Sequence, residues 1–284
     1  MAFRMRARTS VHTSPHYCAS MADGRSAELI TLLSSESPAV EDGLLLLSQA
    51  LQTPDPGDDP PHKSAEIVLG GQRILDELAA ATESSGSSTP DIDMIVNGIF
   101  VDAGFTGDVE NYHAEDNSFL DRVLERRIGM PITLSAVAVA VGRRLGLDLE
   151  LIGLPGHVVV GVPGDSNVFI DAYGGAVVDR VALQHRLASI FGRDIEIRDS
   201  SLTPMSTTAV VTRVSNNLMR TWADKPDKFD RLLDLRVQLP VAQGEQQMLI
   251  EIAEARARFD LAARLKEQAD PNDPDINALW GRLN

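Results

Sequence analysis

The sequence has a single cysteine, Cys18, among its 284 residues. One cysteine excludes an internal disulfide and any metal site built from several cysteines, and it is typical of a reducing compartment, so we expect a cytoplasmic protein. Long apolar runs are also missing, because the longest, residues 132–141, falls well short of the roughly 20 residues that cross a bilayer. An ordinary soluble globular protein is therefore expected.

Positive charge is scarce, since 26 Lys and Arg residues face 41 Asp and Glu residues and give a net charge of −15 at pH 7. Phosphate backbones and anionic lipid headgroups repel such a chain, so we predict neither a nucleic-acid partner nor a membrane partner. The first 20 residues differ, because Arg4, Arg6 and Arg8 precede any acidic residue. They form either a transit-like segment or a disordered extension, and we expect a disordered tail over residues 1–25.

Helical spacing of apolar residues dominates both ends of the chain. It predicts two helices within residues 26–51, a third over 64–82 and a fourth over 91–102, the last started by Thr89 and Pro90. The proline-rich segment 54–61 and the Ser/Gly-rich segment 84–90 predict loops. Beyond residue 180 helices are expected again, over residues 181–191, 205–222, 228–239, 245–255, 258–268 and 275–283. Trp222 and Trp280 are expected to anchor the core between these C-terminal helices.

The centre of the chain has a different pattern. Asp116 or Asn117 is expected to cap a helix that ends at Ile128 and Gly129, and residues 132–144 are apolar on nearly every face, which indicates a buried helix. The period then changes to two at Leu149 and Leu151, and again over residues 158–162 and 168–170, on either side of a Pro-Gly turn. We therefore predict an α+β protein with a helical region over 26–104, a mixed core over 105–200 and a helical region over 201–284.

The predicted hairpin carries the residues most suited to chemistry. His157 opens its first strand and Asp171 closes its second, and their even separation around Gly164 puts both side chains on one face as opposed cross-strand neighbours. A carboxylate there can accept a hydrogen bond from the imidazole and fix its tautomer, as the orienting acid does in a catalytic triad. On spacing alone, His157 is equally open to being a structural histidine after a Pro-Gly turn.

Four motifs bear on that choice, and they occur in this order: Asn117-Ser-Phe-Leu-Asp-Arg-Val-Leu-Glu-Arg-Arg-Ile-Gly-Met-Pro-Ile-Thr-Leu-Ser135, Gly142-Arg-Arg-Leu-Gly146, Gly153-Leu-Pro-Gly-His157 and Phe169-Ile-Asp171. Together they closely resemble the SirB-type branch of the transglutaminase-like superfamily. The resemblance implies a papain/transglutaminase-like core with a small antiparallel sheet, and a C-terminal array of tetratricopeptide-like helices. In that superfamily a cysteine at the start of the buried helix is followed by a His and an Asp on adjacent strands.

The resemblance places His157 and Asp171 at the base and the orienting acid, but it places the nucleophile at Pro131. Proline has no nucleophilic atom, so we expect a remnant triad in a non-catalytic protein that binds a protein or peptide partner. The alternative is a hydrolase or acyltransferase that uses Thr133 or a water activated by His157. Thr133 is better suited to capping its helix or to satisfying a polar group in the core, and Cys18 lies outside the matched region.

No cofactor and no metal is predicted. His113, Glu115 and Asp116 could form a metal site with His157 and Asp171. However, the sequence has no motif such as His-x-x-x-His that would hold two ligands on one helix or strand. Five arginines form basic islands in this acidic chain: Arg122, Arg126, Arg127, Arg143 and Arg144. They could receive a carboxylate from the C-terminal helices or from a partner, although a solvated or internally paired face is the more common arrangement. The sequence gives no indication of the oligomeric state.

Overall fold

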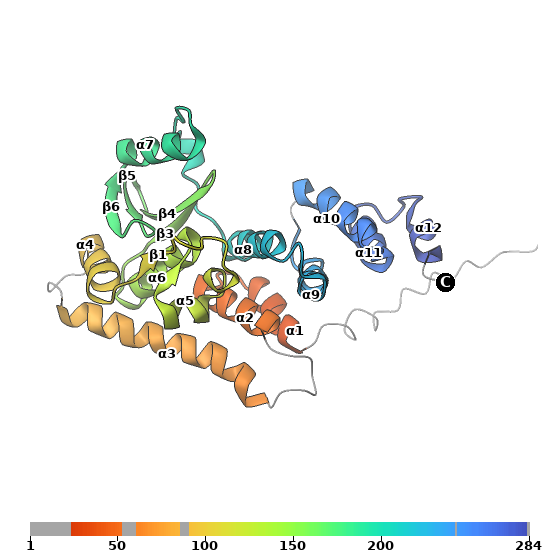
Figure 1. Cartoon of the computed structure of the whole chain (residues 1–284), viewed down its shortest axis with the longest axis horizontal. Helices are drawn as coiled ribbons and strands as arrows, with labels where there is room; N and C mark the ends of the chain where they lie inside the picture. Colours follow the sequence, from red (N-terminus) through yellow and green to blue (C-terminus); the bar gives the residue numbers. More distant parts are fainter. Residues whose placement is uncertain (1–23, 53–60, 86–90, 242, 283–284) are drawn as a thin grey trace, which may run out of the picture.

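The computed structural model describes residues 24–52, 61–85, 91–241 and 243–282, and shows a mixed arrangement of helices and small sheets (Figure 1). Cys18 and most of the expected N-terminal tail, the expected loop over residues 54–61 apart from Pro61, which begins a helix, and the linker with Thr89 and Pro90 lie outside the described residues. Within the described residues, no helix combines the length and the apolar character that spanning a bilayer requires.

Three N-terminal helices form the base of the molecule: α1 (Gly24–Leu33), α2 (Val40–Gln52) and α3 (Pro61–Ser85). The glycine pair in α3 lowers its intrinsic helix propensity, and packing explains one of the two. A Cβ on Gly71 would lie 2.4 Å from Cδ2 of Leu45, a fully buried side chain of α2. Glycine at position 71 therefore allows the two helices to approach closely.

The next segment differs from the expected helices at its ends. Helix α4 (Ile92–Val96) continues into a π-helical turn, η1 (Asn97–Asp102), and its N-cap is Asp91, which accepts a hydrogen bond from Met94 N at 2.8 Å. Helix α5 (Leu120–Arg126) follows a 3-10 turn, η2 (Glu115–Asn117), and neither Asp116 nor Asn117 caps it. The residues expected to end this helix form a strand instead, β2 (Ile128–Gly129), which pairs in parallel with β1 (Thr106–Gly107).

Helix α6 (Pro131–Arg144) lies at the centre, as its apolar composition predicts, and packs against the main sheet. That sheet is antiparallel with strand order β3-β4-β5-β6. Its strands are β3 (Glu150–Leu154), β4 (His157–Val162), β5 (Asp165–Asp171) and β6 (Ala176–Asp179). Between β4 and β5 the turn uses Gly164 at φ +81°, a conformation that glycine adopts without steric cost.

Two apolar layers cover the two faces of this sheet. Val158 and Val160 of β4 belong to the large core that contains α6 and the N-terminal helices. Val159 and Phe169 face the other way, into a smaller cluster with α7 (Arg180–Phe191). Strand alternation therefore assigns odd-numbered residues of β4 and β5 to the α7 side, and that side includes the pair described below.

The C-terminal helices extend away from the sheet in succession (Figure 1). They are α8 (Thr207–Thr221), α9 (Pro226–Arg236), α10 (Gln243–Ala255), α11 (Phe259–Ala269) and α12 (Ile276–Gly281). Helix α8 packs on α2, so this region shares the main core. Trp222 is buried at the end of α8, its ring lies 6.0 Å from that of Phe119 in the central core, and Lys228 of α9 lies over the ring at 5.5 Å. Trp280 is 36% exposed, so the expectation of a core anchor there is wrong.

Candidate functional site

His157 and Asp171 form a buried hydrogen-bonded pair at the start of β4 and the end of β5. Nε2 of His157 lies 3.1 Å from Oδ1 of Asp171, and the two side chains are 3% and 0% exposed. The carboxylate acceptor fixes the proton on Nε2 and leaves Nδ1 as the second ring nitrogen. No residue among those the structure describes makes a hydrogen bond with Nδ1.

The strand register that brings His157 and Asp171 together differs from the expected one. The register pairs Val160 with Ile170 and Gly161 with Phe169, and it shifts between Gly161 and Val162. Continuing this register places Asp171 opposite Val159, so the pair is diagonal across the strands and not directly opposed. The even separation still puts both side chains on one face, because a shift of this kind changes the partner and preserves the alternation within each strand.

A third residue, Arg186 of α7, completes the pair. Its guanidinium forms an ion pair with Oδ2 of Asp171, and Gly174 N donates to Oδ1 at 3.2 Å. Burial raises the pKa of the Asp171 carboxyl, but the hydrogen bond and charge of His157, followed by the charge of Arg186, outweigh it and hold this pKa below its usual value. Asp171 is therefore an ionised acceptor, and sequence patterns do not point to Arg186 because it lies on a separate helix.

The first turn of α6 has no free hydroxyl or thiol. Pro131 is its first residue, where the missing backbone N–H costs nothing. The Thr133 hydroxyl accepts a hydrogen bond from Met130 N at 3.2 Å and lies 2.9 Å from Asn117 O, to which it donates. The Thr133 hydroxyl therefore caps the helix N-terminus. Because Thr133 is also fully buried, its position does not suit a nucleophile.

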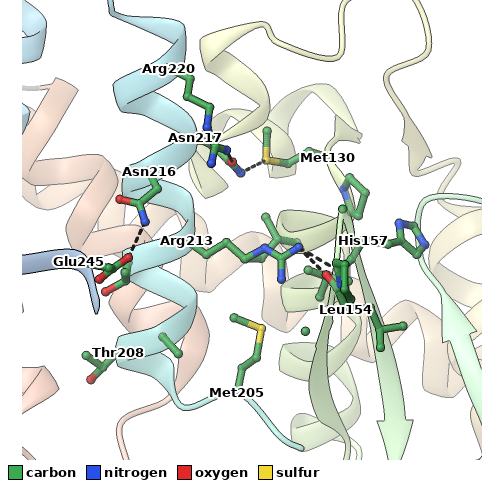
Figure 2. A pocket seen from close by; sticks show the side chains of 18 of the residues that line it. Met130, Leu154, His157, Met205, Thr208, Arg213, Asn216, Asn217, Arg220 and Glu245 are labelled. Carbon is green, nitrogen blue, oxygen red and sulfur yellow. Dashed lines mark hydrogen bonds between the residues drawn. The ribbon is translucent and has the colours of Figure 1, made fainter. Parts of the chain in front are cut away.

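Pro131 and His157 line the same cleft, which has a volume of about 1140 Å³. The cleft lies where the start of α6 and the β3–β4 turn face α8 and the connection from α9 to α10 (Figure 2). A guanidinium from α8, that of Arg213, reaches across to the turn. Apolar side chains including Met130 and Met205 line it together with polar ones. Its size suits a ligand as large as a peptide segment.

The five residues considered above as possible metal ligands do not form a metal site in the described residues. Among the described residues, no three His, Cys, Asp or Glu side chains are placed to hold one metal ion. Glu115 instead binds Lys225 and Lys228 at 3.2 and 2.8 Å and accepts a hydrogen bond from Nε1 of Trp222. It thereby joins the segment before α5 to the turn between α8 and α9.

The basic islands are paired mainly with the N-terminal helices. Arg143 and Arg144 both bind Glu41 of α2, and Arg144 also binds Asp76 of α3 at 2.7 Å. Arg122 donates to Gln52 of α2 at 2.9 Å. Among the described residues these arginines are thus internally paired, the more common of the two arrangements, and no carboxylate of the C-terminal helices binds them; their contacts join α5 and α6 to the N-terminal helices.

The Glu115 contacts predict a loss of stability in acid. Burial raises the pKa of Glu115, but hydrogen bonds from Lys228, Trp222 and Lys225 outweigh it and lower this pKa from 4.5 to about 2. Its stabilising contribution is therefore complete above about pH 4.5 and is lost as the pH falls towards 2. We expect the free energy of unfolding to fall by on the order of 1 kcal/mol more over this window in the native protein than in Glu115→Gln. Denaturant titrations at several pH values measure it, with exposed Glu110→Gln as the control, and equal slopes for all three proteins would contradict it.

A buried helix packed on one face of an antiparallel sheet, and a His–Asp pair on the adjacent strands β4 and β5, are the features that the resemblance to transglutaminase-like domains implies. Residues 71–216, just over half of the chain, match the model of the Transglutaminase-like superfamily. The chain belongs to this superfamily.

Several curated proteins are similar to parts of the chain. A UPF0162 protein of Xylella fastidiosa (strain Temecula1) is 32% identical over 138 residues, which are 47% of this chain and 49% of the relative. A UPF0162 protein of Vibrio cholerae is 24% identical over 189 residues, 65% of this chain and 67% of the relative. F-box only protein 21 of Mus musculus is 33% identical over 79 residues, 25% of this chain and 13% of the relative. The chain spans about half the length of the Xylella relatives it matches.

Proposed function

We propose that this protein is a non-catalytic binding protein and that the cleft lined by Pro131 and His157 holds a segment of a partner protein. One observation carries the proposal: the helix start that would supply a nucleophile presents Pro131, and His157 makes its only described side-chain hydrogen bond to Asp171. An imidazole oriented by a carboxylate without an adjacent nucleophile lacks the group that forms a covalent intermediate.

The cleft itself supports a binding role. It lies against α8, the first of the successive C-terminal helices, which we propose to be tetratricopeptide-like. Helical arrays of this kind bind protein segments along their concave surfaces. Methionines such as Met130 and Met205 adapt to different apolar side chains, which suits a surface that accepts a peptide.

The second candidate function is hydrolysis by an activated water. Asp171 holds Nε2 of His157, and Nδ1 has no described partner, so a water at Nδ1 would have a general base beside it. This candidate uses the same pair and needs no nucleophile at position 131. Acyl transfer through Thr133 is less suited, since that hydroxyl is buried and occupied.

Binding and turnover can be measured on one set of proteins. We expect immobilised full-length protein to retain members of a synthetic random peptide pool, because the cleft has room for an extended segment. Ala209→Trp fills the cleft from an exposed position of α8 and should lower retention at least tenfold. Ala223→Trp is the matched control, because Ala223 is exposed outside the cleft. A panel of thioester, peptide and ester substrates should show no turnover.

Two results would overturn the proposal. Retention that is equal in Ala209→Trp and Ala223→Trp would mean that the cleft is not the binding site. Turnover that disappears in His157→Ala would show catalysis and support the second candidate, since that candidate places the imidazole at the reacting atoms.

A further inference from the structure

Arg213 of α8 is a partly buried cation inside the cleft. Its Nη2 donates to Leu154 O at 2.9 Å and to His157 O at 3.0 Å, and these two bonds hold the guanidinium against the β3–β4 turn (Figure 2). Gly153 leaves room for Met205 and Arg213 together, because a Cβ there would lie 2.7 Å from Sδ of Met205 and 3.2 Å from Nη1 of Arg213. The guanidinium is therefore fixed in position before any ligand arrives.

No carboxylate neutralises this cation among the residues the structure describes. Burial lowers the pKa of Arg213, the direction expected when a positive charge leaves water without a counter-ion. Other arginines that are largely withdrawn from water have carboxylate partners, as Arg144 has Glu41 and Arg236 has Glu245. Arg213 thus bears a desolvation cost that a bound anion would offset.

The rest of the cleft adds positive charge. Arg220 lies two helical turns further along α8 and also lines the cleft, and its Nη1 donates to Asn217 at 3.2 Å. Among the described residues that line the cleft, Glu245 is the only acidic one, and it is already bound to Arg236 at 2.6 Å and to Asn216 at 2.7 Å. In a chain with a net charge of −15, this lining is locally cationic.

From this arrangement we infer that the cleft recognises a carboxylate on the bound segment, and that Arg213 is its anchor. This inference rests on the proposed function and names the chemistry of the ligand. Arg213 is held by two carbonyl oxygens, whereas Arg220 is exposed and bound to Asn217, so the cleft presents one fixed guanidinium. One such cation balances one negative charge, which matches a carboxylate, whereas phosphate groups are bound by clusters of cations. Nε and Nη1 of Arg213 remain as donors, and Met130 and Met205 contact the apolar part of the segment.

Synthetic peptide pools test the carboxylate directly on the native full-length protein. Acetylated random hexapeptides with neutral side chains are prepared with a free C-terminal carboxylate, with a C-terminal amide, and as amides that contain one Asp or Glu. A fourth pool of amides contains one phosphoserine. We expect retention of a carboxylate pool at least tenfold above the neutral amide pool. Enrichment of the free-acid pool identifies a chain terminus as the source, and enrichment of the Asp/Glu pool identifies a side chain.

Variants assign the preference to Arg213. Arg213→Gln should remove the difference between carboxylate and neutral pools, and Arg193→Gln, which removes an exposed arginine outside the cleft, should preserve it. Equal retention of the neutral amide pool by the native protein would overturn the inference and leave the proposed binding function intact. Stronger retention of the phosphoserine pool would also overturn it. Retention of none of the pools would contradict the binding function itself. Because the decisive comparison uses the native protein, it holds even where a variant fails to fold.

Discussion

Glu245→Ala is expected to lower the free energy of unfolding by about 3 to 5 kcal/mol, because it leaves a buried guanidinium without its carboxylate. Arg236 is 0% exposed, and Glu245 binds it at 2.6 Å from the first turn of α10. In the part of the chain that the structure describes, the remaining acceptor, Pro240 O, lies 3.3 Å from Nη1, and Nε has no partner. The substitution also removes the acceptor of Asn216 Nδ2. Urea denaturation followed by circular dichroism measures the loss.

Two further variants separate the buried charge from other effects of the substitution. Glu251→Ala removes an exposed carboxylate from the same helix and should change stability by less than about 0.5 kcal/mol. The double variant Glu245→Ala/Arg236→Met replaces the charged pair with apolar atoms and should regain most of the loss. A Glu245→Ala protein within about 1 kcal/mol of the native one would show that water reaches Arg236 and that the α9–α10 connection is loosely packed.

The periodicity of the sequence is sufficient to locate the elements whose pattern is local. Helix α6 and strands β4 and β5 lie where apolar spacing predicts them. The faces of these elements that are buried determine the spacing of apolar residues within each element, so a short stretch of sequence is enough to locate it. Strands β1 and β2 have only two residues each and pair across a distance in sequence, so they have no period to detect. Asn117 reads as a helix cap, yet it is fully buried and donates to Asp108 Oδ2 at 2.9 Å. Tertiary contacts outweigh the local preference there.

Some features of the candidate site are likewise predictable from the sequence, and others are not. The even spacing of His157 and Asp171 is enough to put them on one face, whereas the register shift at Gly161 that makes them diagonal has no sequence signature of its own. Arg186 and Arg213 reach the site from helices, at sequence separations of 15 from Asp171 and 56 from His157. Only folding brings these two cations to the pair and the cleft, so a search for motifs overlooks them.

Pro131→Cys is expected to create a reactive thiol if the cleft keeps the geometry of the superfamily. In a Cys18→Ser background the new sulfur would sit at the N-terminus of α6 in the cleft that His157 lines. The partial positive charge of the helix end lowers thiol pKa values, as does an imidazole that lies beside the sulfur, and we expect a shift of about 2 units below the usual ~8.5. At pH 6 the thiolate fraction then rises by nearly a hundredfold, but the lower basicity of the thiolate reduces its intrinsic reactivity, so iodoacetamide should react about tenfold faster than with a free thiol.

The pH profile of alkylation distinguishes an activated thiol from one that is merely accessible. In Pro131→Cys the rate should rise with a midpoint about 2 pH units below that of Ala223→Cys, an exposed thiol outside the cleft that serves as the reference. Adding His157→Gln should return most of this shift, because the helix end alone contributes only a modest part of it. A thiol at position 131 that titrates like the one at position 223, in a protein shown to be folded, would mean that the imidazole does not face α6. The His–Asp pair would then be a structural element of the sheet and α7, since Arg186 already satisfies the second oxygen of Asp171.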